Sequence, residues 1–151
     1  MSTHSRIGYV ESDGTVKSVY VHWDGYPSNN GRILLDHYDT LEKVIELVSL
    51  GSLSSLGEKV SPADGTEHTF DNPQLDVCIA YHRDRGEDWN ITMPRIDKSV
   101  DDFMERGVEE YGYLFKDGRW YAVNGHREKK DRKLHILDNT LIEKSEETDQ
   151  W

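Results

Sequence analysis

Two glycine-containing turns, each flanked by strand-like segments, constrain the fold of this chain more than any other sequence feature. The four segments are residues 6–10, 16–23, 113–115 and 119–123. Asp13-Gly14 lies in the first turn and Asp117-Gly118 in the second. An Asp-Gly pair between two apolar runs is typical of a β-hairpin. The sequence therefore predicts one antiparallel hairpin near each end of the chain.

Helical spacing of apolar residues predicts two helices between these hairpins. Residues 41–50 form the clearer one, and Asp39 is expected to cap its N-terminus. Residues 100–111 form the other, with Ser99 as the expected cap. A third, short helix is expected over residues 32–38.

Alternating side chains predict a further strand over residues 75–81, and edge strands are expected over 134–137 and 141–143. Two hairpins, a further strand and two or three helices indicate an α+β fold. In such a fold the helices pack on one face of a mainly antiparallel sheet built from hairpins.

The 151 residues are enough for one domain with a core of its own. Residues 1–143 are assigned to that domain. The polar segment 58–74 holds two of the four prolines and is predicted to be a mobile loop. Residues 144–151 are predicted to be a frayed acidic tail.

Charge narrows the expected partners. The chain has 18 basic and 29 acidic residues, which gives a net charge of −11. Because duplex DNA is bound mainly through basic faces, no duplex binding is expected. The one basic run, residues 127–133, is interpreted as a solvated loop. No apolar run approaches the roughly 20 residues of a membrane helix, so no membrane partner is expected.

The sequence predicts no cofactor and no metal site. It contains no phosphate-loop, dinucleotide or deaminase pattern, and its seven histidines are scattered. The single cysteine, Cys78, excludes a disulfide scaffold and is expected to pack in the core.

The first candidate site follows the second predicted strand. Its side chains are Tyr20, His22, Asp24 and Tyr26. If the strand continues to Asp24, the carboxylate shares a face with His22 and can orient it as a general base. In the alternative interpretation Trp23 anchors the core, Asp24 belongs to a turn, and His22 forms local hydrogen bonds.

The second candidate site lies in a densely charged segment. Its side chains are His82, Arg83, Arg85 and Glu87. Two arginines near a glycine can grip a phosphate or a carboxylate. In the alternative interpretation the arginines form an internal network with Asp84, Glu87 and Asp88.

The two segments form one polar pocket if the fold brings them together. That pocket would contain His22, Asp24, Tyr26, His82, Arg83 and Arg85. Its cationic edge suits an anionic small molecule such as a nucleotide.

Five segments of the sequence form a recognisable set: residues 3–8, 20–31, 50–57, 80–87 and 113–121. The most specific are His-Trp-Asp-Gly-Tyr-Pro and Tyr-His-Arg-Asp-Arg-Gly-Glu. The set resembles a family of small tailed-bacteriophage and prophage proteins that has no assigned activity. The resemblance implies an accessory protein of the infected bacterial cytoplasm, engaged in host takeover or counter-defence, and transfers no catalytic residue.

These observations favour a phage accessory binding protein whose partner is a host protein or an anionic small molecule such as a nucleotide. The alternative is a small hydrolase or transferase acting on a phosphorylated substrate. His22 and His82 would then be its acid and base groups, with Asp24 as the orienting carboxylate. A second alternative is a virion or assembly component. The sequence leaves open whether the protein forms a homo-oligomer.

Overall fold

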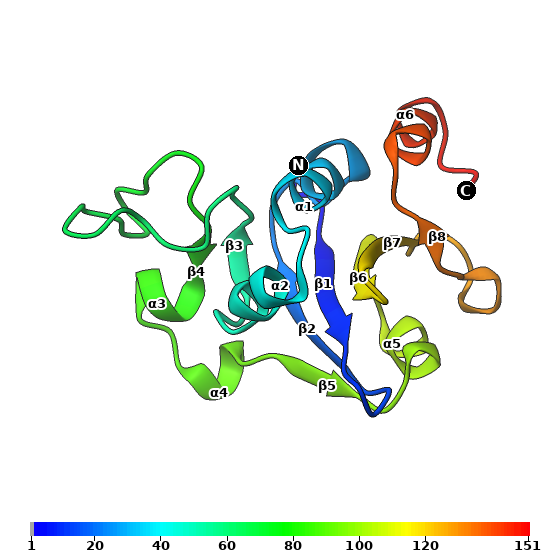
Figure 1. Cartoon of the computed structure of the whole chain (residues 1–151), viewed down its shortest axis with the longest axis horizontal. Coiled ribbons are helices and arrows are strands. Elements are labelled where there is room, and N and C mark those ends of the chain that lie inside the picture. The colour runs from blue at the N-terminus through cyan, green and yellow to red at the C-terminus, as the bar shows by residue number, and fades with distance from the viewer. Residues whose placement is uncertain (1) are drawn as a thin grey trace.

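Eight strands form one mixed sheet in the computed structural model, which describes residues 2–151 (Figure 1). The strands are β1 (Ser5–Val10), β2 (Val16–Val21), β3 (Leu53–Ser55), β4 (Ile79–Ala80), β5 (Arg95–Asp97), β6 (Tyr111–Lys116), β7 (Arg119–Asn124) and β8 (His135–Ile136). Their order is β4-β3-β2-β1-β6-β7-β8, and β5 pairs with β2.

Six α-helices and two short turns of other helix types complete the chain. The α-helices are α1 (Arg32–His37), α2 (Leu41–Val48), α3 (Tyr81–Arg85), α4 (Trp89–Thr92), α5 (Val100–Arg106) and α6 (Asn139–Glu147). The π-helical turn η1 (Pro27–Gly31) leads into α1, and the 3-10 turn η2 (Lys129–Asp131) precedes β8. No helix within residues 2–151 is long and apolar enough to cross a membrane.

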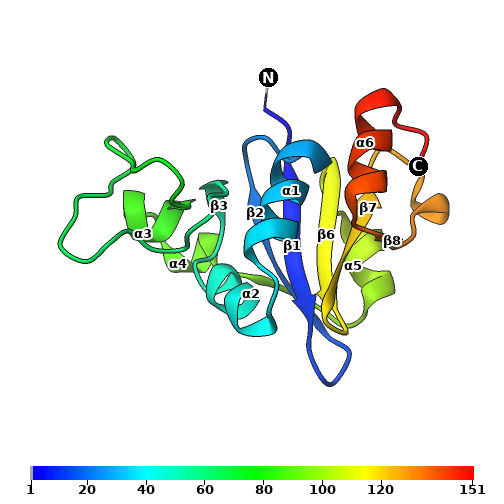
Figure 2. The ribbon, with the colours of Figure 1, turned by 45° about the horizontal axis from the view of Figure 1, so that its top comes forward.

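Both predicted hairpins are present. β1 and β2 pair antiparallel from Ser5–Val21 to Val10–Val16, and β6 and β7 pair antiparallel around Asp117-Gly118. A parallel pairing of β1 with β6 joins the two hairpins in the middle of the sheet (Figure 2). The predicted α+β class with a mainly antiparallel sheet is confirmed.

The larger core lies between the sheet and three helices. It includes alternate strand residues such as Ile7, Val19 and Tyr113, which lie on one face of the sheet. Leu34 of α1, Val44 and Leu47 of α2, and Leu141 and Ile142 of α6 cover them.

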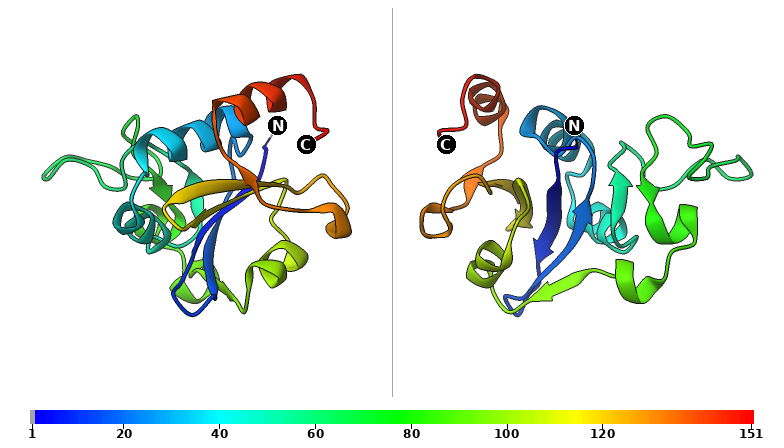
Figure 3. Two further views of the ribbon diagram at one scale, coloured as in Figure 1. Left: turned by 45° about the vertical axis from the view of Figure 1, so that its right-hand side comes forward. Right: turned by 180° about the vertical axis from the view of Figure 1, so that it is seen from behind.

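A smaller core lies on the opposite face, where α5 covers it. Phe103 packs there with Val16, Leu114 and Val123. Figure 3 shows α5 on the other side of the sheet from α1 and α6. Helices therefore cover both faces rather than one. The cause is β5, which pairs with β2 and leads the chain on to α5 at the second face.

The α2 and α5 helices were predicted, and one of their two predicted N-terminal caps is correct. Ser99 caps α5 as expected, because its hydroxyl accepts from the Asp102 N–H. Thr40 rather than Asp39 caps α2, and the Asp39 carboxylate instead pairs with Lys43 at 2.9 Å.

The strand predicted over residues 75–81 is much shorter than expected. Only Ile79–Ala80 pairs as a strand. Leu75 is 89% exposed, and Asp76 has a left-handed backbone with φ of 70°. The alternation of side chains therefore reflects a turn and not a half-buried strand.

The C-terminal segment also differs from expectation. Residues 141–143 belong to α6 instead of an edge strand, because Asp138 caps the helix by accepting from the Leu141 N–H. Residues 144–151 are not a frayed tail. The Trp151 ring is buried and stacks on Tyr111 at 6.1 Å, and Asn124 donates to the Trp151 carbonyl.

Replacing Phe103 tests the second core. We expect Phe103→Ala to lower the free energy of unfolding by about 3–5 kcal/mol, because the side chain is fully buried. Urea unfolding followed by circular dichroism measures this change. Ile91→Ala, at a position that is 81% exposed, is the control and should change stability by less than about 0.5 kcal/mol. Equal losses in the two variants would contradict the packing of α5.

Candidate functional site

The chain leaves the sheet soon after His22. The strand β2 ends at Val21, and the His22 and Trp23 N–H groups donate to Leu53 and Ser54. Asp24 then takes a left-handed backbone with φ of 53°. The strand does not continue to Asp24, and no hydrogen bond or ion pair within residues 2–151 joins its carboxylate to His22. The condition for the predicted His22–Asp24 pair is therefore not met.

His22 instead belongs to a cluster of rings, which we call the histidine cluster: His4, Tyr20, His22 and Trp23. The Tyr20 hydroxyl lies 2.7 Å from His22 Nδ1. The His4 ring lies 4.6 Å from that of His22, and the Trp23 ring meets His22 edge-on at 4.7 Å. Trp23 is 43% exposed, so the interpretation of Trp23 as a core anchor is wrong.

Tyr20 holds the orientation of His22 as a neutral partner. Burial raises the pKa of Tyr20, and the charges of Tyr81, Glu109 and Glu110 raise it further. The hydroxyl is therefore protonated near neutral pH and available for the hydrogen bond to His22. The hydrogen bond between Tyr20 and His22 can orient the imidazole ring. It provides no carboxylate that would stabilise the protonated ring.

His4 was missed in the sequence, although the hairpin register contains the signal. Ser5 pairs with Val21, so the antiparallel register places His4 opposite His22. Counting the residue pairs of the first hairpin outward from its turn would have shown that His4 lies opposite His22.

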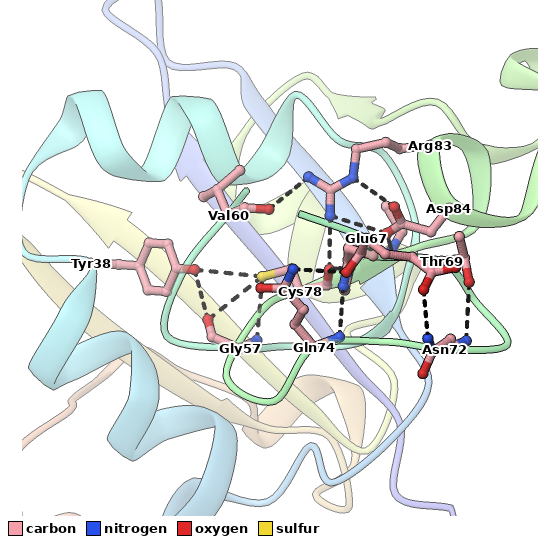
Figure 4. A network of polar contacts seen from close by, with 12 residues as sticks. Tyr38, Gly57, Val60, Glu67, Thr69, Asn72, Gln74, Cys78, Arg83 and Asp84 are labelled. Atoms are coloured by element: carbon pink, nitrogen blue, oxygen red, sulfur yellow. Dashed lines mark hydrogen bonds and ion pairs between the residues drawn. The ribbon is translucent and has the colours of Figure 1, made fainter. Parts of the chain in front are cut away.

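The guanidinium of Arg83 is committed to an internal network (Figure 4). Its Nη1 donates to the Val60 carbonyl at 2.6 Å, and its Nη2 donates to the Cys78 carbonyl at 2.8 Å. Its Nε and Nη2 also donate to the two carboxylate oxygens of Asp84, at 2.9 and 3.0 Å. The internal-network interpretation therefore describes Arg83, with Asp84 and loop carbonyls as the partners.

Asp84 is the buried centre of this network. Its side chain is 3% exposed, accepts from the Ala80 N–H, and lies 3.4 Å from His68 Nε2. Burial alone would raise the pKa of Asp84, but hydrogen bonds from Arg83 and Ala80 and the charges of Arg83 and His68 hold it below its ordinary value.

The same network pins the irregular loop at residues 58–74 to the core. His68 Nδ1 accepts from the Gln74 N–H, and His68 Nε2 lies 2.9 Å from the Cys78 carbonyl. Tyr38 donates to the Gly57 carbonyl at 2.7 Å. Burial raises the pKa of the Cys78 thiol, which is typical of core packing. The mobility of the loop stays a prediction.

The other predicted residues of the second site lie at the surface. Arg85 lies over the Phe70 ring at 4.6 Å and 3.9 Å from Glu87. His82 Nδ1 lies 2.7 Å from the Glu87 carbonyl, and its ring meets Trp89 edge-on at 5.2 Å.

The two candidate segments do not meet in one pocket. β3 lies between them, because Leu53 pairs with Val21 on one side and with Ala80 on the other. Two strand spacings amount to about 10 Å. No hydrogen bond or ion pair in the described part of the chain joins residues 20–31 to residues 81–89. Tyr26 stays exposed on its own side.

A third feature was not predicted: a run of exposed apolar side chains, which we call the α4–β5 strip. It consists of Trp89, Ile91, Met93 and Ile96, which are between 38 and 81% exposed. The strip begins where the second candidate segment ends, through the contact of Trp89 with His82. The signal in the sequence is four large apolar residues within eight positions.

Comparison with known proteins gave no match among protein-family models, curated proteins or solved structures. Within residues 2–151, no group of three or more His, Cys, Asp or Glu side chains is arranged to hold a metal ion. The function must therefore be argued from the surfaces described above.

A pair of arginine variants tests the internal role of Arg83. We expect Arg83→Ala to lower the free energy of unfolding by about 3 kcal/mol, because it leaves the buried Asp84 carboxylate without its main partner. Arg85→Ala is the matched control and should cost less than about 1 kcal/mol, since its ion pair is exposed. Chemical denaturation of both variants measures the difference, and equal small losses would reject the network.

The depressed pKa of Asp84 predicts an acid-sensitive contribution to stability. A carboxylate with a lowered folded pKa stabilises the fold fully above its ordinary value of 3.8, and this contribution is lost as the pH falls through the folded pKa. Urea unfolding at a series of acidic pH values should show a steeper loss for the wild type than for Asp84→Asn. Parallel curves for the two proteins would contradict the assignment.

Proposed function

We propose that this chain is a bacteriophage accessory protein that binds a host protein in the bacterial cytoplasm through the α4–β5 strip. The exposure of the four apolar side chains in that strip is the observation that carries the proposal. Single exposed apolar residues are common on protein surfaces, but four within eight positions of the chain are more than this background, and such groups are found at interaction sites.

The surroundings of the strip favour a partner with basic groups around an apolar patch. Glu87 and Asp88 border its start, and no cation within residues 2–151 pairs with Asp88. Arg95 and Arg106 both pair with the buried Asp97, whose single carboxylate offsets one of their two positive charges. The whole chain carries −11, which favours association with a basic surface.

A host protein is favoured over a nucleotide at this segment. The arginine expected to grip an anion, Arg83, has its donors engaged by Asp84 and two carbonyls. Trp89 and Ile91 offer apolar contact area, which suits the buried centre of a protein interface. The phage setting rests on the motif resemblance described above.

An enzymatic role has less support. The 2.7 Å contact of Tyr20 with His22 is compatible with acid–base chemistry. The other residues assigned to that chemistry are Asp24, which does not contact His22, and His82, which lies beyond β3. We therefore place binding ahead of turnover.

A strip variant with a matched control tests the proposal. Ile91→Asp/Met93→Asp replaces two of the four apolar side chains of the strip, and Leu75→Asp replaces an exposed apolar residue after the loop. A host protein captured from bacterial lysate by the wild type is purified and titrated against all three proteins. We expect the strip variant to bind at least about tenfold more weakly, and the Leu75 variant to match the wild type.

Two results would overturn the proposal. One is a purified partner that binds the strip variant as tightly as the wild type. The other is the absence of any captured protein whose direct binding can be measured. Circular dichroism of each variant checks that the fold is intact.

A further inference from the structure

A basic pocket lies at the β8 end of the sheet, away from the α4–β5 strip (Figure 1). Its volume is about 520 Å³. Residues from η2, the segment around β8, and α6 form its walls. The cationic side chains that line it are Arg127, Lys130, Arg132, Lys133 and Lys144.

The charge of this pocket is opposite to that of the rest of the protein. Five Lys and Arg side chains line it against one carboxylate, that of Asp131, in a chain of net charge −11. Within residues 2–151, Lys130 is the only one of the five with an ion pair, at 3.6 Å from Glu128. The basic run at residues 127–133 is therefore more than a solvated loop, since the fold adds Lys144 from α6 to it.

Arg132 gives the pocket a defined shape. Its guanidinium donates to the carbonyls of Met104, Gly125 and Arg127, at 3.0, 2.8 and 3.2 Å. These bonds tie the loop around η2 to the body of the protein. They leave the positive charge of Arg132 without a carboxylate partner.

Two aromatic residues, His135 and Trp151, form part of the pocket wall. The ring of His135 meets Trp151 edge-on at 5.3 Å. Burial lowers the pKa of His135, and the positive charges of Lys133, Lys144 and Arg127 lower it further. An anion bound beside these cations would offset their repulsion of a protonated His135.

We propose that this pocket binds a compact organic polyphosphate, of the class of nucleoside di- and triphosphates. Several cations that lack carboxylate partners favour a ligand with more than one phosphate group. A long nucleic acid is disfavoured, because the chain as a whole carries a net charge of −11. This site is separate from the α4–β5 strip and does not depend on the proposed function.

Calorimetric titration with inorganic pyrophosphate, ADP and inorganic phosphate tests the site. We expect pyrophosphate and ADP to bind, and inorganic phosphate to bind about tenfold more weakly. Lys133→Gln/Lys144→Gln should weaken pyrophosphate binding by at least about tenfold. Lys43→Gln/Lys59→Gln removes the same charge from exposed positions elsewhere and should leave binding unchanged.

An NMR titration of His135 gives a second readout. Bound pyrophosphate should raise the pKa of His135, because the anion offsets the repulsion from Lys133, Lys144 and Arg127. The absence of binding heat, an unmoved His135 titration, or equal affinity for phosphate and pyrophosphate would overturn the proposal. Equal weakening in the two lysine double variants would also overturn it.

The strip variant separates this proposal from the proposed function. Ile91→Asp/Met93→Asp should bind pyrophosphate like the wild type, because the strip and the pocket share no residue. A loss of pyrophosphate binding in that variant would contradict the independence of the two sites.

Discussion

The parallel pairing of β1 with β6 is the constraint on which the rest of the structure depends. It sets Ile7 beside Tyr113 and places the odd-numbered residues of β1 and β6 on the same face. Beyond the strand ends, the His4 N–H donates to the Glu110 carboxylate at 2.7 Å. The pairing of β1 with β6 closes the long stretch of chain between the two hairpins, and closing so long a loop is entropically unfavourable. The hydrophobic cores on the two faces of the sheet must supply the compensating stability.

The parts of the fold that could be predicted are those encoded locally. Hairpin turns and amphipathic helices show their periodicity within a few residues, as at Asp117-Gly118 and in α2. The short strands β3 and β5 carry no such pattern, because their pairing depends on neighbours far away in sequence. Leu53, for example, is a strand residue because Val21 and Ala80 flank it. The basic pocket escaped prediction for the same reason, because Lys144 and Trp151 reach it from outside the basic run.

The segment at residues 20–31 serves the fold at several positions. A side chain at Gly25 would place a Cβ 2.8 Å from the Thr3 carbonyl oxygen, so a larger residue does not fit. The Gly25 carbonyl accepts from the buried Tyr113 hydroxyl at 2.6 Å. Asn30 is fully buried and donates to the Ser5 hydroxyl. Trp23 and Tyr26 are the exposed aromatic residues of this segment, so a binding partner could contact them.

The central position of β1 also governs what happens while the chain is being made. The ribosome delivers β1 and β2 first, but the second neighbour of β1 exists only once β6 has been translated. For most of synthesis the nascent hairpin therefore presents the backbone donors and acceptors of β1 as an open edge. Open edges pair readily with other chains, so slow translation or crowded ribosomes would favour aggregation over folding. A factor that covers the free edge of β1 until β6 emerges would therefore favour folding over aggregation.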